Sequence, residues 1–183
     1  ITQDGIRVRA SAGAGSYRRR QKLRTCLREA QRQVERLRRE LDADPGVTSR
    51  REAAARQRAA RERQQRVKQA LAQLREEEAE RGERAKARPH EKKGEARAST
   101  TDPEARVMRM ADGGYRPAYN GQIATDATSQ IIVAVDLVPR TTDHGQLEPM
   151  CAQIERRYGT PPAAMLVDGG FVTLADIDVL EQQ

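Results

Sequence analysis

The stretch LRTCLREAQRQVERLRREL, residues 23–41, decides most of the fold. Its apolar side chains follow one another at intervals of four, three, four, three and four residues: Leu23, Leu27, Ala30, Val34, Leu37 and Leu41. This spacing sets them along one side of an α-helix and is typical of a coiled-coil seam. We therefore predict a long amphipathic helix that needs a partner for its seam.

A second helix is predicted directly after the first. The connecting stretch DADPGVTS, residues 42–49, contains a Pro-Gly pair that cannot continue a helix. Thr48 or Ser49 can cap the helix that follows, and from about Arg50 to the mid-80s the four-three spacing resumes in Val67, Leu71 and Leu74. Two long helices joined by a short connection indicate an antiparallel helical hairpin.

The positive charge of the chain belongs to this hairpin. Residues 17–98 hold 26 Lys+Arg against 14 Asp+Glu, a balance of +12, whereas the remaining residues hold 8 against 13. A polyanion such as DNA is the natural partner of such a segment, through neutralisation of phosphates and release of counterions. A solvated helical surface is the alternative reading of the same composition.

The candidate DNA contacts are the basic side chains of the hairpin, with acidic side chains interleaved as helix-stabilising pairs. They are Arg18, Arg19, Arg20, Lys22, Arg56, Arg58, Arg61 and Arg63. Aromatic residues make up 3% of the chain, which argues against base stacking as the main mode of binding. We expect contacts mostly to phosphates. A DNA-contacting arm and a device for self-association both fit this segment.

The residues on either side of the hairpin follow different patterns. In ITQDGIRVRA, residues 1–10, the apolar side chains alternate after Asp4-Gly5, which predicts a short strand entered through a turn. Residues 87–101 are charged and poor in large apolar side chains, and we expect a mobile linker over 89–101. The domain boundaries predicted from this are 1–16 for the first strand, 17–88 for the hairpin and 102–183 for the rest of the core.

The region 102–183 is predicted to be rich in β-structure. Runs at 119–125 and 129–138 suggest a β-hairpin, and the continuous apolar run IIVAVDLV is expected of a strand buried on both faces. A helix is predicted from about His144 to Tyr158, ended by Gly159. AAMLVDGG then reads as a short strand ending in Asp168, followed by a helix starting near Thr173.

With the hairpin set aside, the predicted order is strand, strand, strand, helix, strand, helix, with Asp4 on the first strand and Asp168 ending the last. This order matches an α/β fold with a ribonuclease-H-like mixed sheet, interrupted by a long α-helical hairpin insertion. An acid at the carboxyl end of a strand is well placed for function in such a sheet. Taken alone, however, an Asp-Gly-Gly sequence more often only caps a turn.

Several blocks of this sequence resemble the transposases of bacterial insertion sequences, in the DDE group named for its catalytic Asp, Asp and Glu. The blocks are DGIRVRASAGAGS at 4–16, DPEARVMRMADGGYRPAYNGQIATD at 102–126, TTDHGQLEPM at 141–150 and LVDGGF at 166–171. They run in collinear order over almost the whole chain. The resemblance implies cleavage and transfer of DNA strands at transposon ends, with double-stranded DNA as partner and self-association on it.

The resemblance also implies site residues. The first family aspartate falls on Asp4, in a motif usually written Asp-Gly-Thr, where Ile6 stands at the third position. The second falls on Asp168, with the aromatic Phe171 where the family has Tyr. The family glutamate would lie beyond the last predicted helix, and Glu181 is too close to Asp168 to replace it. We accordingly expect this chain to be part of a longer protein.

Carboxylates suit the chemistry that the resemblance implies. Two divalent ions bridged by carboxylates activate water or a 3′-hydroxyl on one side of a phosphodiester and stabilise the departing oxygen on the other. Mg²⁺, with Mn²⁺ as an alternative, prefers oxygen ligands, so Asp and Glu suffice. Asp4 and Asp168 would be metal ligands rather than nucleophiles.

Four further residues are candidates for the site. Asp126 stands in the predicted hairpin turn and is expected to be structural, whereas Asp136 interrupts a strand and could lie at an edge or face the metal ions. Asp143 is predicted to be the N-cap of the following helix, and His144 a residue at its start. As an alternative, Asp143 and His144 form a wall of the active site.

Two other functions remain open to the sequence: a non-catalytic nucleic-acid-binding or regulatory remnant of a transposase, and a coiled-coil assembly module. The chain has no apolar run of membrane-spanning length and no signal-peptide pattern at its start, so we expect a cytoplasmic, nucleoid-associated protein with no membrane partner. Cys26 and Cys151 lie far apart, without the spacing of metal ligands, and are expected to be buried or idle thiols.

Overall fold

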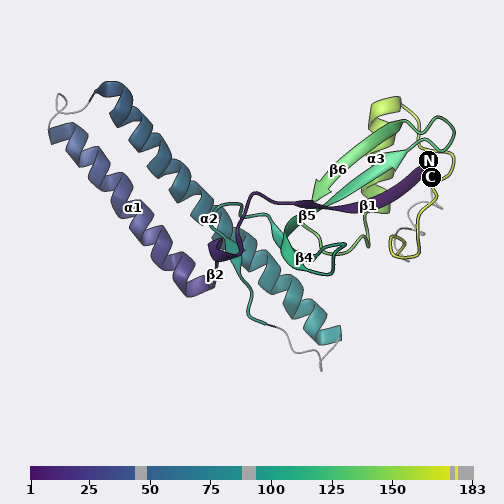
Figure 1. Cartoon of the computed structure of the whole chain (residues 1–183), viewed down its shortest axis with the longest axis horizontal. Helices are drawn as coiled ribbons and strands as arrows, with labels where there is room; N and C mark the ends of the chain where they lie inside the picture. The colour runs from purple at the N-terminus through teal and green to yellow at the C-terminus, as the bar shows by residue number, and fades with distance from the viewer. Residues whose placement is uncertain (44–48, 88–93, 174–175, 177–183) are drawn as a thin grey trace. The chain divides into compact units, whose positions relative to one another are not determined.

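The structure is a computed structural model that describes residues 1–43, 49–87, 94–173 and 176. The chain divides into two compact units. One consists of Ser11–Ala105 and the other of Ile1–Ala10 together with Arg106–Gln183. The protein is a mixed α/β structure with antiparallel sheets and a long helical hairpin, drawn in Figure 1.

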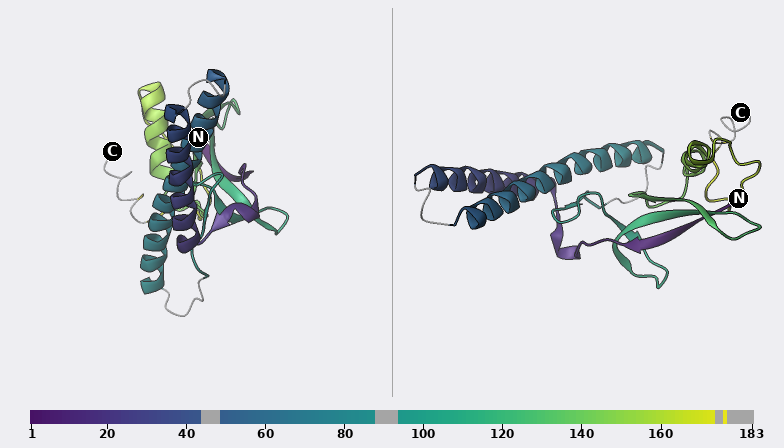
Figure 2. Two further views of the ribbon diagram at one scale, coloured as in Figure 1. Left: turned by 90° about the vertical axis from the view of Figure 1, so that its left-hand side faces the viewer. Right: turned by 90° about the horizontal axis from the view of Figure 1, so that it is seen from above.

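The predicted helical hairpin is confirmed. Helix α1 (Arg20–Ala43) and helix α2 (Arg50–Ala87) lie side by side, as Figures 1 and 2 show from three directions. Leu23 of α1 packs with Ala70 and Leu74 of α2 in a buried cluster. The oxygen Oγ of Ser49 accepts a hydrogen bond from the Glu52 amide at 3.2 Å, which is the predicted N-cap of α2.

The predicted linker is wrong in its last residues. Strand β3 (Ala98–Ser99) pairs antiparallel with β2 (Tyr17–Arg18), which follows the short 3₁₀ helix η1 (Ala14–Ser16). Ala96 and Ala98 are buried in the same cluster as Leu23. The sequence did not predict this contact, because alanine contributes little to an apolar pattern. In the fold, however, the small side chains of Ala96 and Ala98 fit closely against the helices of the hairpin.

The second unit is built on a four-stranded antiparallel sheet. The long central strand β5 (Tyr115–Thr125) pairs with β1 (Thr2–Arg9) on one side. On its other side it pairs with β4 (Arg106–Arg109) and, further along, with β6 (Ile132–Val138). The predicted hairpin of β5 and β6 is present, with a connection longer than predicted because β6 begins at Ile132.

Two predictions about these strands are wrong. Asp4 and Gly5 lie inside β1 rather than in a turn before it, because their backbones pair with Ile123 and Gln122 of β5. Strand β6 is not buried on both faces: Val135 and Leu137 are each about half exposed, and only Ala134 is fully buried. Since β6 pairs with β5 and with no other strand of the described residues, it is an edge strand with one covered face.

Helix α3 (Leu147–Tyr158) covers one face of the sheet. Its Met150 and Ile154 pack on Ala124 of β5 and Ala134 of β6. The helix begins three residues later than predicted and ends where expected. Gly159 closes it in the left-handed conformation, with φ of 78° and its amide donating to the Glu155 carbonyl at 2.7 Å.

The predicted strand before Asp168 is reduced to a single bridge, in which Leu166 pairs in parallel with Thr2 of β1. The helix predicted near Thr173 falls mostly outside the described residues. Its start is visible, since Thr173 and Asp176 exchange side-chain and backbone hydrogen bonds in the manner of a capping box.

Both cysteines are free thiols, as expected, with Cys151 buried and Cys26 partly so. In the parts of the chain that the structure describes, no helix combines the length and the apolar character needed to cross a membrane.

Candidate active site and basic hairpin

An isolated bridge joins the two segments that carry the predicted catalytic aspartates. Thr2 and Leu166 form a parallel bridge, held by hydrogen bonds from the Gln3 amide to the Leu166 carbonyl (3.0 Å) and from the Leu166 amide to the Ile1 carbonyl (2.8 Å). Asp4 and Asp168 each stand two residues beyond the bridged pair. The pairing does not continue past this bridge, and Asp168 lies just before the turn at Gly169 and Gly170. The bridge therefore places the two segments side by side, with one aspartate on each.

Each of these carboxylates is exposed and makes one local hydrogen bond. Oδ1 of Asp4 accepts from the Gly5 amide, and Oδ1 of Asp168 accepts from the Gly170 amide, both at 2.7 Å. The Asp168 bond is the turn cap that the sequence raised as an alternative. Within the described residues, Oδ2 of neither aspartate has a hydrogen-bond partner, so one oxygen of each is open to a ligand.

Register also separates the other acids from this pair. Across the sheet, Asp4 lies in one row with Ile123 and Val135, whereas Asp136 lies in the next row with Gln122. Since successive residues of a strand face opposite sides, Asp136 belongs to the other face.

Asp126 is structural, as expected. Its Oδ2 accepts hydrogen bonds from the amide and the hydroxyl of Ser129, and these bonds hold the pKa of this carboxyl below its usual value.

The predicted N-cap role of Asp143 is wrong. Helix α3 has Gln146 at its N-cap, without a side-chain bond, and Asp143 points back to the sheet instead. Its Oδ1 accepts from Asn120 Nδ2 at 2.6 Å and from Gln122 Nε2 at 2.9 Å, and its Oδ2 lies 3.8 Å from Nη2 of Arg7. The side-chain amides of Asn120 and Gln122 on β5 therefore bind this carboxylate in place of the backbone amides at the start of α3.

Buried polar side chains around Asp143 were not foreseen from the sequence. Gln3 donates from Nε2 to Oε1 of Gln122 (2.9 Å) and to the Gln146 carbonyl (3.1 Å), and all three residues are buried. These residues, together with Asn120 and Asp143, form a polar cluster. It lies on the face of the sheet opposite to Asp4. A signal was present in YNGQIATD, where Asn120 and Gln122 recur at a spacing of two within an otherwise apolar strand.

Gly5 of β1 packs closely against this cluster. A Cβ atom at position 5 would stand 2.4 Å from Oδ1 of Asp143 and 3.2 Å from Nε2 of Gln122. The glycine next to Asp4 is therefore needed for packing against Asp143. His144, the other candidate for an active-site wall, is exposed, and α3 begins only at Leu147.

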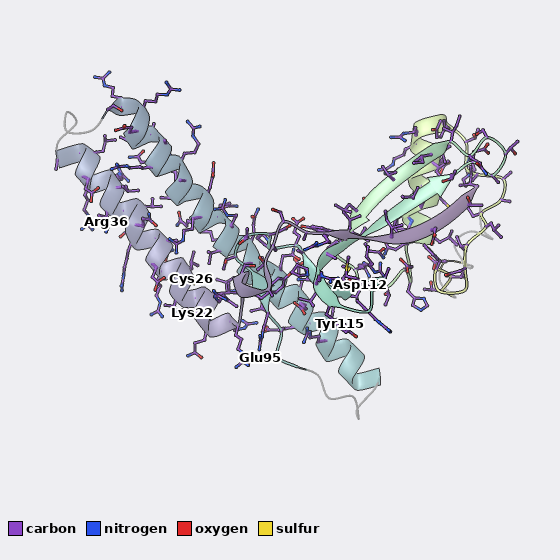
Figure 3. The ribbon with its side chains drawn as sticks, viewed as in Figure 1. Lys22, Cys26, Arg36, Glu95, Asp112 and Tyr115 are labelled. Atoms are coloured by element: carbon purple, nitrogen blue, oxygen red, sulfur yellow. The ribbon has the colours of Figure 1, made fainter. Side chains whose placement is uncertain are left out.

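Basic side chains at the base of the hairpin are engaged in the fold. Arg19 pairs with Glu95 at 2.8 Å, and Arg20 forms a bidentate pair with Glu78, Nε lying 3.2 Å from Oε1. Arg18 donates to the carbonyls of Gly15 and Tyr17. Lys22 is exposed at the start of α1, as Figure 3 shows. Three of the predicted DNA contacts thus already have partners within the chain.

Basic side chains in the first half of α2 are exposed instead. Arg56, Arg58, Arg61 and Arg63 are exposed and Arg66 is partly so, and within the described residues none of them reaches a carboxylate. A groove of about 460 Å³ lies between this half of α2 and α1. Its lining includes four arginines and one glutamate: Arg36, Arg56, Arg63, Arg66 and Glu40.

The donor set at Asp4 and Asp168 consists of hard oxygens, which fit Mg²⁺ or Mn²⁺. In the described part of the chain, no three or more His, Cys, Asp or Glu side chains gather as a metal site, so these two carboxylates stand without a third. Comparison of the chain with family models, with curated proteins and with solved structures finds no match.

Proposed function

We propose that this chain is part of the catalytic domain of a DDE transposase, which cuts and joins DNA at the ends of an insertion sequence. The observation that carries the proposal is the parallel bridge between Thr2 and Leu166, two residues before Asp4 and Asp168. It supports a metal-binding pair built from segments at opposite ends of the chain. The order β1, β5, β6, α3 and the Leu166 segment also fits a ribonuclease-H-like core.

In this proposal the two aspartates supply open carboxylate oxygens. A pair of Mg²⁺ or Mn²⁺ ions held there would supply Lewis acidity for in-line attack on a phosphodiester. Asp4 and Asp168 bind and orient these ions and are neither nucleophiles nor proton carriers. The polar cluster on the other face of β1 holds the strand that carries Asp4, through Gln3 and through the contact of Gly5 with Asp143.

Metal binding is the first test, because it needs no DNA substrate. Isothermal titration with Mn²⁺ is expected to show binding to the wild-type chain and a loss of about tenfold or more in affinity for Asp4→Asn and for Asp168→Asn. Asp126→Asn is the matched control, since Asp126 is used in its own turn with Ser129. Equal affinity in all four proteins would remove the basis of the site.

Strand cleavage is the second test. A chain extended past Gln183 to the glutamate that the resemblance implies is expected to nick or join transposon-end DNA with Mg²⁺ or Mn²⁺. Asp4→Asn and Asp168→Asn should each abolish the reaction, because each removes a ligand charge from the metal ions. Undiminished activity in either variant would refute the assignment and favour a non-catalytic DNA-binding protein.

A further inference from the structure

The arginines in the first half of α2 reach no carboxylate among the described residues, and Arg63 donates only to the amide oxygen of Gln33, at 3.5 Å. These arginines and the groove beside them need an explanation that the fold itself does not supply. Residues 50–68 hold eight basic and two acidic side chains, whereas residues 69–82 hold two basic and four acidic ones. Side chains three or four residues apart on a helix are neighbours, and like charges at that spacing cost stability. Arg58 with Arg61 and Arg63 with Arg66 are such pairs. An arrangement that disfavours the free helix points to an anionic ligand.

The apolar seam of α1 is incompletely covered in this half of the hairpin. Val34, Leu37 and Leu41 of α1 remain partly exposed, whereas the small Ala60 of α2 is buried. Leu37, Ala59 and Ala60 line the groove beside its arginines. Arg36 contributes from α1, where Figure 3 shows it, and forms an ion pair with Glu40 at 3.5 Å.

The arginines are too far apart to serve one small anion. Arg56 and Arg66 are ten residues apart on α2, which corresponds to about 15 Å along a helix. A ligand that neutralises both must carry charges at repeated intervals. The two helices contain no aromatic residue on which a base could stack, so the contacts available are those to phosphates. A second copy of the same surface would bring like charges together.

We infer that this groove, lined by Arg36, Arg56, Arg63 and Arg66, is a docking site for the phosphate backbone of double-stranded DNA. The inference takes from the proposed function only the class of partner and assigns the contact to one half of the hairpin. The base of the hairpin, with Arg19 and Arg20 in ion pairs, has a structural role. Binding at the groove requires no metal ion and no particular base sequence.

The experiment measures binding of the whole chain to a labelled duplex by fluorescence anisotropy, in the presence of EDTA. The test variant replaces Arg56, Arg63 and Arg66 with Gln. The control makes the same charge change on the outward side of α1, at Arg28, Arg32 and Arg39, which are exposed and do not line the groove. Far-UV circular dichroism checks that both variants keep their helices.

The test variant is expected to bind at least about tenfold more weakly at about 0.1 M salt and to lower the slope of log K against log salt by about two to three, as three lost phosphate contacts require. The control should lose less than about threefold. Replacing the same three groove residues with Lys should retain most of the affinity, because neutralising a backbone phosphate needs mainly the charge.

Several outcomes would overturn the inference. Equal losses in the test and control variants would show that only overall charge matters. A poly-glutamate peptide that displaces the duplex at equal charge would point to an acidic protein as the ligand, and a single strand that binds as tightly would exclude duplex recognition.

The groove and the proposed metal site can be tested separately. DNA binding is expected to be unchanged in the Asp4→Asn variant, so either proposal can fail alone.

Discussion

Substitution of Gly5 by alanine tests the contact between β1 and the polar cluster. The new Cβ would stand 2.4 Å from Oδ1 and 3.0 Å from Cγ of Asp143, so that carboxylate must move away. It would then lose its bonds from Asn120 Nδ2 (2.6 Å) and Gln122 Nε2 (2.9 Å). Asn120 keeps a second acceptor, the Thr142 carbonyl at 3.3 Å, whereas Gln122 Nε2 is left without its partner.

The magnitude follows from these two bonds. Hydrogen bonds to a charged acceptor contribute about 1.5–3 kcal/mol each, and a stranded buried donor costs about 1–3 kcal/mol. Because one of the two amides retains a partner, we expect Gly5→Ala to lower the free energy of unfolding of this unit by about 2–4 kcal/mol. Asp143→Ala should have a similar cost, since it removes the same two bonds.

The double variant distinguishes a steric contact from two separate effects. Once Asp143 is alanine, the Cβ at position 5 meets no carboxylate, so Gly5→Ala should add little. The two losses should then sum to about 2 kcal/mol or more above the loss measured for the double variant. Gly169→Ala is the control, because no heavy atom lies within 4 Å of a Cβ built there.

The assay is urea unfolding followed by the backbone amide signals of β1 and β5 in NMR spectra. These signals report on the sheet, whereas circular dichroism would be dominated by the 62 residues of α1 and α2, 24 and 38 respectively. Losses that add within about 0.5 kcal/mol would refute the reasoning, because residues without contact behave additively.

Three further predictions concern single residues. Gly82→Ala should stabilise α2 by up to about 1 kcal/mol in thermal unfolding, because Gly82 lies inside the helix with no atom near its Cβ position; a loss of stability would contradict this. The bonds from Ser129 lower the pKa of Asp126 from its usual value of 3.8, so their stabilisation is present above pH 3.8 and is lost as the pH falls through the lowered pKa. Ser129→Ala should raise that pKa in a carboxyl ¹³C titration, and an unchanged value would exclude the contact. Burial raises the pKa of the Cys151 thiol above 9.0, so iodoacetamide should modify it more slowly in the folded protein than in urea, and stability should fall as the pH rises through the raised pKa. Equal rates of modification would show that the thiol is open to solvent.

The sheet shows where sequence reasoning reached its limit. The continuous apolar run in β6 predicted a buried strand, yet β6 is an edge strand with Val135 and Leu137 half exposed. The number of neighbours that a strand has depends on the whole sheet, and an apolar run does not encode it. Asp143 shows the same limit, because a helix end and two amide donors competed for one carboxylate.

Sequence alone determined the helical hairpin, a cap for α2 at Thr48 or Ser49, the end of α3 at Gly159 and the concentration of positive charge in one segment. All of these depend on residues close in the chain, whose spacing matches the period of a helix or the needs of a cap. Only the tertiary structure decided which arginines are already paired, that Asp143 lies against Gly5, and that the segment before Asp168 is bridged to the strand that carries Asp4. These contacts join residues as far apart as Gln3 and Gln146, separated by 143 positions, and such pairing is fixed by strand register and packing rather than by local pattern.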